Sequence, residues 1–327
     1  MSPNPLVSVV IPAYNCAPFI SETLESVYRQ TYTNLEIVLV DDGSTDDTPS
    51  ALAPHMDRIR YLYQENKGTA AARNAGIQMA KGDLIAFLDN DDLWFPEKID
   101  LQVRVLQEHP ECGLVFTDGK EIDGSRVLRD SLMANHLQSW IDQRDDQDSR
   151  VMHGWLFNEL ITLNFICSAS GVMVRKQSVK RIGGFDERIA IADDYDLYLR
   201  MARLYPMAYL RPCLYVWRYR KESQSGSRNN RQYRWTKAML PVLEKHLHIM
   251  PMELRPQVRR RLLNMYWQIG WLDFNQNRFK DSRQKFLGCL RHNRFFMPAM
   301  LYLLASYLDP SFIRKIRYVK QQVSMMS

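Results

Sequence analysis

Three carboxylates follow an apolar run in the segment LIAFLDNDDLWFP, residues 84–96: Asp89, Asp91 and Asp92. Like charges this close repel one another, so a fold keeps them together only where a cation or hydrogen-bond donors compensate. A hard divalent cation such as Mg²⁺ or Mn²⁺ binds one or two protein carboxylates and takes its other ligands from water and phosphate oxygens. The pattern therefore predicts a divalent-cation site. The alternative is a solvated turn in which Asp89 caps a helix beginning near Pro96.

Two further acidic clusters lie at the ends of expected elements. VDDGSTDDT, residues 40–48, ends a strand, and IADDYDLYLR, residues 191–200, opens a helix. Turn and capping chemistry accounts for either cluster taken alone. Parallel strands bring their carboxyl ends to one edge of a sheet, which is where such sheets bind ligands. We therefore expect the three clusters to converge on one site.

The elements that must position these acids follow from hydrophobic periodicity. Short β-branched runs alternate with amphipathic segments, and the sequence predicts strands at 6–11, 35–40, 59–64 and 83–88, with helices at 20–30 and 68–82. This alternation predicts an α/β fold with a mostly parallel central sheet flanked by helices. The small residues of 68–82 should allow that helix to pack closely on the sheet.

The second half of the chain is less regular. Residues 120–165 are expected to form an irregular segment, with 142–150 its most loop-like part and a helix near 155–163; it could serve as a flap or acceptor loop. A strand, a turn leading into a helix, and one or two closing strands are expected at 170–176, 183–205 and 207–220. Beyond residue 232 the pattern is helical, so we predict domains at 1–232 and 233–327.

Composition restricts the class of protein. The chain has 327 residues and a net charge of +6, and residues 251–327 carry 14 Lys and Arg against 4 Asp and Glu, a net of +10. This basic tail suits an anionic membrane surface, nucleic acid or a solvated helical face, and charge alone does not choose among them. Five scattered cysteines without a CxxC pair favour a reducing compartment. We expect neither a signal peptide nor a membrane-spanning helix.

The motifs VSVVIPAYN, VDDGSTDDT, ENKGTAAARNAG, GDLIAFLDNDD, GGFDE and DDYDLYLR, in this order, resemble family 2 glycosyltransferases over about residues 6–220. The resemblance implies the glycosyltransferase A fold, a Rossmann-like nucleotide-diphospho-sugar transferase fold. It also implies an inverting enzyme that moves a sugar from a nucleotide-diphosphate donor to a hydroxyl.

The resemblance implies a slot for the nucleotide at the first strands. Pro12, Ala13 and Tyr14 match the loop that flanks the base, and Asp42 matches the acid that accepts from the uracil ring in uridine-using relatives. Arg73 lies in a segment that borders the nucleotide; the alternative for Arg73 is an ordinary arginine on a helix surface.

The DNDD segment matches the family's metal and donor site. Asp91 corresponds to the acid that coordinates a divalent cation, Mn²⁺ or Mg²⁺, and Asp89 is placed to reach the ribose or the metal. Asn90 and Asp92 are expected beside the donor. Trp94 could stack on a sugar or anchor the core.

The resemblance implies that Asp194 is the general base that takes the acceptor's proton. Family members often have Glu-Asp at this pair, whereas this chain has Asp193 and Asp194. The side chain of Asp193 is one methylene shorter than that of Glu, so the substrate contact expected at Asp193 is less secure than the role of Asp194. Many relatives also carry a histidine after the closing strand, but this sequence has no histidine there. Arg218, Arg220 or Lys221 could replace it on the diphosphate, or form an exposed basic loop.

The predicted activity is transfer from a UDP-linked sugar to a glycan or lipid-linked acceptor in cell-envelope polysaccharide synthesis. The rival functions are a non-catalytic nucleotide-sugar-binding module and a nucleotidyltransferase; a helical scaffold for a partner could coexist with any of them. Residues 262–308 resemble a single tetratricopeptide-like helix pair, and 295–308 could form an interfacial helix. We expect a cytoplasmic protein that contacts the inner face of the membrane through this tail, with no nucleic-acid partner and with self-association left open.

Overall fold

The computed structural model describes residues 2–133, 151–220 and 228–308. Its contacts divide the chain into two compact units, Met1–Ser227 and Arg228–Ser327, which are described separately below. The most loop-like part of the expected irregular segment, 142–150, and the candidate phosphate contact Lys221 lie outside the described residues.

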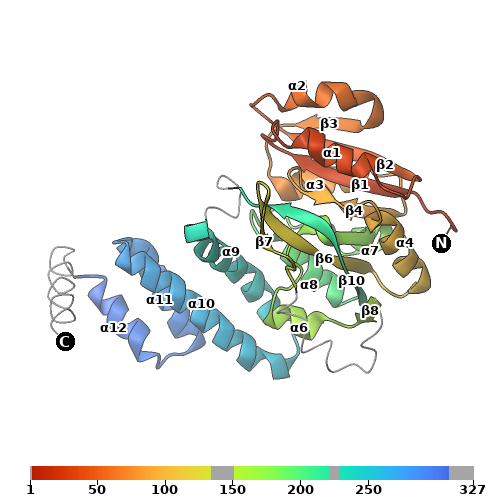
Figure 1. Cartoon of the computed structure of the whole chain (residues 1–327). Helices are drawn as coiled ribbons and strands as arrows, with labels where there is room; N and C mark the ends of the chain where they lie inside the picture. Colours follow the sequence, from red (N-terminus) through yellow and green to blue (C-terminus); the bar gives the residue numbers. More distant parts are fainter. Residues whose placement is uncertain (1, 134–150, 221–227, 309–327) are drawn as a thin grey trace. The chain divides into compact units, whose positions relative to one another are not determined.

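The first unit is built on one ten-stranded sheet with the order β3-β2-β1-β4-β9-β6-β10-β5, with β7 paired to β6 and β8 to β10 (Figure 1). Its strands are β1 (Val7–Ala13), β2 (Leu35–Asp42), β3 (Arg60–Gln64), β4 (Leu84–Phe87), β5 (Leu93–Trp94), β6 (Leu114–Asp123), β7 (Arg126–Arg129), β8 (Val151–Gly154), β9 (Val172–Arg175) and β10 (Met207–Arg218).

The sheet is parallel from β3 through β2 and β1 to β4 and mixed beyond β4. β1 pairs in parallel with both β2 and β4, and β2 with β3, whereas β9 runs antiparallel between β4 and β6. β6 and β10 are parallel to each other. The predicted α/β class is confirmed, and β1, β2 and β4 end at the same edge, which brings the acidic segments together.

Helices cover both faces of the sheet (Figure 1). They are α1 (Ile20–Tyr28), α2 (Thr48–Leu52), α3 (Thr69–Met79), α4 (Lys98–Glu108), α6 (Phe157–Thr162), α7 (Lys176–Arg181) and α8 (Asp193–Ala202), with the 3₁₀ turns η1 (Ala53–Arg58) and η2 (Ala169–Gly171). Side chains alternate along β1: Val9 packs with the buried residues of α1 and α4, and Val10 lies under α3. The strand is apolar throughout because both faces are buried.

The expectation of an irregular segment over 120–165 is wrong at three places. β6 continues to Asp123, and the short strands β7 and β8 add to the sheet. These strands are short and partly polar, so periodicity does not reveal them. Pairing stabilises them: β7 lies antiparallel on β6, where Arg129 forms an ion pair of 2.6 Å with Glu121.

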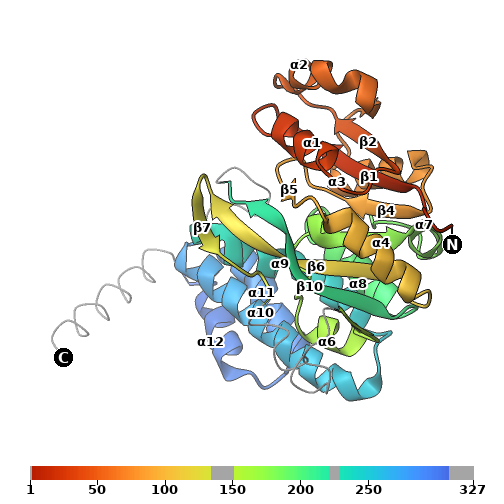
Figure 2. The ribbon, with the colours of Figure 1, turned by 45° about the vertical axis from the view of Figure 1, so that its right-hand side comes forward.

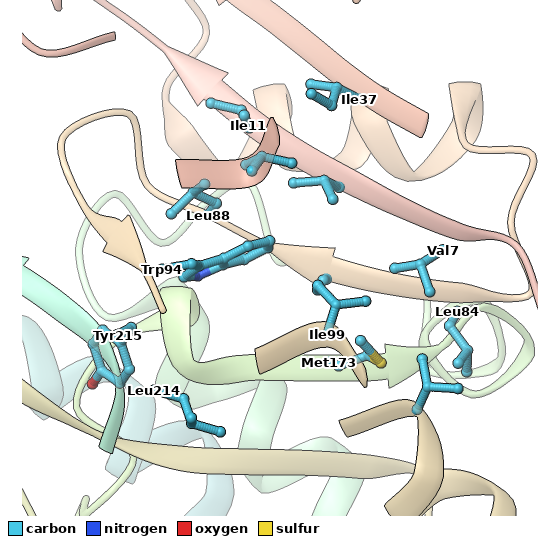
Figure 3. Close-up of a cluster of buried hydrophobic side chains, with 14 of the residues drawn as sticks. Val7, Ile11, Ile37, Leu84, Leu88, Trp94, Ile99, Met173, Leu214 and Tyr215 are labelled. Atoms are coloured by element: carbon cyan, nitrogen blue, oxygen red, sulfur yellow. The ribbon is translucent and has the colours of Figure 1, made fainter. Parts of the chain in front are cut away.

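Apolar side chains from both halves of the sheet form one core (Figure 3). Val7, Ile11 and Leu84 come from the parallel strands, and Met173 and Tyr215 from β9 and β10. The core thus extends from the parallel strands to the antiparallel strand β9. Packing from both halves of the sheet therefore fixes the position of the turn after β4.

The second unit is helical, as predicted. It contains α9 (Arg228–Leu247), the 3₁₀ turn η3 (Met252–Leu254), α10 (Arg255–Asn275), α11 (Phe279–His292) and α12 (Met297–Ala305). α10 and α11 lie side by side (Figure 2), and a Cβ on Gly288 would lie 2.4 Å from the ring of Tyr266, so the missing side chain permits their close approach. Among the described helices, none is long and apolar enough to cross a bilayer.

Gly76 sets how closely α3 can approach the sheet, because a Cβ there would lie 2.4 Å from a methyl carbon of Val10. Gly76→Val should destabilise the protein by roughly 1–3 kcal/mol through overpacking. Gln78→Val, at an exposed position of the same helix, should change the stability by less than about 0.5 kcal/mol. Denaturant unfolding measures both, and equal midpoints for the two variants would contradict the close packing of α3.

Candidate active site

The acids after β4 form a turn at the edge of the sheet. Leu88 continues the strand by donating its N–H to Val10 O at 3.1 Å, and the N–H of Asp92 closes the turn on Asp89 O at 3.1 Å. The N-cap of α4 is Glu97, without a side-chain capping bond. The alternative in which Asp89 caps this helix is therefore wrong.

Arg73 connects this turn to the third acidic cluster. Its guanidinium is 4% exposed; Nη2 donates to Asp89 Oδ1 at 2.7 Å and Nη1 donates to Asp193 Oδ2 at 2.8 Å. The two carboxylates raise the pKa of Arg73 although burial lowers it, so the charge is retained. The alternative of a helix-surface arginine is wrong: Arg73 joins α3, the turn after β4 and the start of α8.

Asp194 follows directly on this ion pair and is 8% exposed. Burial and the charge of Asp193 raise the pKa of Asp194, whereas Arg73 and the backbone N–H of Tyr195, at 2.7 Å, oppose the rise; the pKa of Asp194 is about 7. Ala192, which precedes both acids, has a left-handed φ of 67°, a conformation that costs a β-carbon residue energy and redirects the chain into α8. The side chain is thus a carboxyl that titrates near neutrality.

Asp91 and Asp92 have different surroundings. Asp92 is fully buried and accepts hydrogen bonds from Ser170 Oγ at 2.6 Å and from the backbone N–H of Arg218 at 3.2 Å, which ties the turn to β9 and β10. Burial together with Asp91 and Asp89 raises the pKa of Asp92 well above its usual range. Asp91 forms an ion pair of 2.6 Å with Arg220, and burial raises its pKa.

Two arginines at and just after the end of β10, Arg218 and Arg220, reach the acidic turn. Arg218 reaches back to the backbone oxygen of Asp91 and forms an ion pair with Glu22, and its side chain is 12% exposed. The ring of Phe19 lies under both guanidiniums, 5.3 Å from Arg218 and 4.7 Å from Arg220. The alternative of an exposed basic loop is wrong for these two residues.

Asp42 is placed to organise the loop before α3. Its carboxylate is 3% exposed and accepts from Gln64 Nε2 at 2.7 Å and from the backbone N–H groups of Lys67 and Gly68 at 2.9 and 2.8 Å. Gly68 precedes α3 with φ 92° and ψ 163°, a conformation open almost only to glycine. Asp42 therefore fixes the start of the helix that carries Arg73.

Of the remaining predicted site residues, most lie at the edge of the sheet and one lies in the hydrophobic core. Pro12 and Ala13 are buried at the end of β1, and Tyr14 follows them with 45% of its surface exposed. Asn90 lies half-buried in the acidic turn and accepts from Thr23 Oγ1 at its backbone oxygen. Trp94 lies in the core (Figure 3), where its indole N–H donates to Ser170 O at 2.7 Å. This position favours the core role for Trp94.

Four buried residues beside the acids were not predicted from the sequence. Ser168 and Ser170, before β9, donate to Asp92 at 3.3 and 2.6 Å. Tyr198 and Tyr215 are buried, and their hydroxyls have no hydrogen-bond partner among the described residues. No local pattern marks these positions, because a serine or tyrosine near a strand is common and its partner is distant in the chain.

The acidic turn has the chemistry of a site for a hard cation. Asp89 and Asp91 offer carboxylate oxygens, the ligand type that Mg²⁺ and Mn²⁺ prefer. Burial is the main cause of the raised pKa values of Asp91 and Asp92, and Asp89 raises both further; a divalent cation would favour the charged carboxylates. The donor set therefore fits such an ion.

Comparison with known proteins agrees with this architecture. Residues 8–183 match the sequence profile of glycosyl transferase family 2. An uncharacterized glycosyltransferase of Rickettsia typhi is 33% identical over 203 residues, which make up 62% of this chain and 60% of that protein. Chondroitin synthase of Escherichia coli is 32% identical over 215 residues, 64% of this chain and 28% of the synthase. The match therefore spans less than two thirds of either relative.

Solved structures share the fold at low sequence identity. The Staphylococcus aureus protein TarS, residues 1–349 with UDP-GlcNAc, has a TM-score of 0.55 and 17% identity, covering 92% of this chain and 89% of that one. The mannosyltransferase PcManGT of Pyrobaculum calidifontis, solved with GDP-Man and Mn²⁺, has a TM-score of 0.58 and 20% identity, covering 93% and 80%. The family profile covers more than half of the chain, and the chain therefore belongs to glycosyltransferase family 2, as its motifs predicted.

Proposed function

We propose that this protein is an inverting glycosyltransferase that moves a sugar from a UDP-linked donor to a hydroxyl of a glycan or lipid-linked acceptor. The observation that carries the proposal is the contact of Arg73 with Asp89 and Asp193, next to Asp194, whose pKa is about 7. A group with this pKa is a suitable base at neutral pH. TarS is described with UDP-GlcNAc and PcManGT with GDP-Man, which supports a nucleotide-sugar donor.

The donor nucleotide is assigned to the edge formed by β1 and β2. Pro12, Ala13 and Tyr14 border it there, and Tyr14 offers an exposed ring for stacking on a base. Asp42 is assigned to the base edge, and it also holds the start of α3 through Lys67. We assign uridine because an acid at this position accepts from the uracil ring in the relatives that the motif resembles.

A divalent cation is assigned to Asp91, with Asp89 as a second ligand. When bound it would neutralise charge that develops on the departing diphosphate. Asp91 is paired with Arg220 at 2.6 Å, and this arginine, with Arg218, is assigned as a second source of positive charge for phosphate oxygens. PcManGT was solved with Mn²⁺, which supports a metal of this kind.

Asp194 is assigned as the base, and Asp193 and Arg73 position it. The acceptor hydroxyl gives its proton to the Asp194 carboxylate as its oxygen attacks the anomeric carbon from the face opposite the diphosphate. The C–O bond to the diphosphate breaks with its electron pair, so the sugar is transferred with inversion. Arg73 holds Asp193 by a 2.8 Å hydrogen bond, which fixes the first turn of α8 and with it the direction of Asp194.

Envelope polysaccharide assembly at the inner face of a membrane is the proposed setting. The relative named chondroitin synthase supports a glycan product. Apolar side chains of the tail are exposed at Phe295, Leu301, Leu304 and Tyr307, next to the exposed Arg294. Such a surface suits the headgroup region of an anionic leaflet, where each basic residue contributes ~1 kcal/mol.

Turnover of a panel of nucleotide sugars tests the transferase and its base. We expect release of UDP with Mn²⁺ or Mg²⁺ and none with EDTA. Asp194→Asn should lower kcat by roughly 10²- to 10⁴-fold, the usual contribution of a general base, while donor affinity by calorimetry is kept. Asp91→Asn should weaken the dependence on metal.

Asp57→Asn, at an exposed aspartate, is the matched control and should retain full turnover. Equal turnover by Asp194→Asn and this control would show that Asp194 is not the general base. Donor binding without release by the wild type, even with envelope extract as acceptor, would favour the binding-module function.

The pH dependence of kcat/KM tests the electrostatic role of Arg73. Asp194 acts as a carboxylate, so activity should rise with pH through about 7. Arg73→Gln removes the charge that lowers the pKa of Asp194, so the rise should move to higher pH. The variant should also lose roughly 3–5 kcal/mol of stability, because the buried Asp193 and the half-buried Asp89 lose their partner. Arg73→Lys keeps the charge and should keep the rise near 7; a folded Arg73→Gln with an unshifted profile would refute this role.

Sedimentation with lipid vesicles tests the tail. The wild type should bind vesicles containing phosphatidylserine more strongly than neutral ones, and high salt should weaken the binding. Leu301→Glu combined with Leu304→Glu should abolish it. Gln257→Glu combined with Gln268→Glu adds the same charge at exposed positions of α10 and should change it little. If the wild type stays unbound at low salt, the membrane assignment is wrong.

A further inference from the structure

Two histidines and a glutamate meet at the edge of the sheet opposite the acidic turn. His109 directly follows α4, Glu111 lies in the connection to β6, and His153 lies on β8 opposite Ala208 near the start of β10. β4 and β6 both run antiparallel to β9, so they point the same way. Asp89 follows the carboxyl end of β4, whereas His109 and Glu111 precede the amino end of β6.

The three side chains offer ligand atoms at nearly the right spacing for one ion. Nδ1 of His109 and Nδ1 of His153 each lie 3.6 Å from Oε1 of Glu111, and one ligand atom from each residue lies within 4.8 Å of the other two. The imidazole rings are 4.1 Å apart. In a tetrahedral zinc site with bonds of 2.0–2.2 Å, neighbouring ligand atoms are about 3.3 Å apart. Small side-chain rotations would therefore complete the site.

The backbone that carries the ligands is held in place. The N–H of His109 donates to Val105 O at 2.9 Å, and its own carbonyl accepts from Cys112 N at 3.1 Å and from Arg175 Nη2 at 3.1 Å. The Cys112 thiol donates to Glu111 Oε1 at 3.9 Å, which orients the carboxylate. β8 is fixed by its pairing with β10. Ligands on rigid backbone lose little conformational freedom when a metal binds.

The chemistry of the set favours a transition metal. Imidazole nitrogens suit zinc, copper and nickel, whereas Mg²⁺ and Ca²⁺ take oxygen ligands. Two histidines and one carboxylate are a known zinc ligand set that leaves a fourth position for water. The side chains of Glu111 and His153 are about half exposed, so an ion and its water can enter from solvent.

We propose that His109, Glu111 and His153 bind one Zn²⁺ ion and that this ion links β8 to the connection between α4 and β6. The site is separate from the carboxylates of the proposed active site in both place and ligand type. Its role is to stabilise the fold, since the metal joins two segments more than forty residues apart in the chain.

Metal titration of chelator-treated, tag-free protein tests the site, in the presence of excess Mg²⁺ to saturate carboxylate sites. We expect one equivalent of Zn²⁺ to bind and to raise Tm, and Co²⁺ to give a visible absorption band typical of a four-coordinate ion. His109→Ala, His153→Ala and Glu111→Gln should each weaken binding by at least about tenfold, a loss comparable to or larger than that from removing an outer-shell partner. His248→Ala, at an exposed histidine outside the cluster, should bind as the wild type does.

The readouts do not depend on sugar transfer, so the site can be tested whether or not the proposed activity holds. Zinc affinity equal in the wild type, His109→Ala and His153→Ala would overturn the proposal and assign any binding to thiols or scattered surface groups. Absence of a Tm shift and of a Co²⁺ band in the wild type would also overturn it, leaving a histidine pair that shares a carboxylate.

Discussion

The buried guanidinium of Arg73, between Asp89 and Asp193, is the interaction on which the candidate active site depends. It lies where a strand end and a helix start bring carboxylates together away from water. Without a cation these groups could not stay ionised side by side, because burial and mutual repulsion both favour protonation. Burial raises the pKa of Asp193 and Arg73 opposes that rise, while Asp194 keeps a raised pKa of about 7. One arginine thus pairs with Asp89 and Asp193, while the neighbouring Asp194 can accept a proton near neutral pH.

The position of Arg73 is set by the packing of α3. Asp42 holds the loop before the helix through the N–H groups of Lys67 and Gly68, and Gly76 lets the helix approach β1. The end of β2 and the acidic turn are therefore linked through α3. Asp42 helps to determine where the guanidinium lies, so a change at Asp42 should also disturb the acids that Arg73 contacts.

A second set of contacts fixes the acidic turn from the other side. Asp92 accepts from Ser170 and from the backbone of Arg218, and Arg220 pairs with Asp91. The parallel half of the sheet supplies the acids, and the segments next to β9 and β10, in the mixed half, supply their donors. This division explains why the sheet becomes mixed beside the site: an antiparallel β9 brings the residues that precede it to the edge where β4 ends.

The α/β class, the strands β1 to β4, the helical tail and the family can be predicted from the sequence, because they depend on local periodicity and on short motifs. The positions of Asp91, Asp193, Asp194 and Arg73 in those motifs also mark them as candidates. The burial of Arg73 and the place of Trp94 in the core are visible only in the folded chain, since burial depends on which distant segments pack against a residue. The short strands β7 and β8 and the meeting of His109 with His153 were likewise undetectable, because pairing between distant segments, rather than local pattern, brings them about.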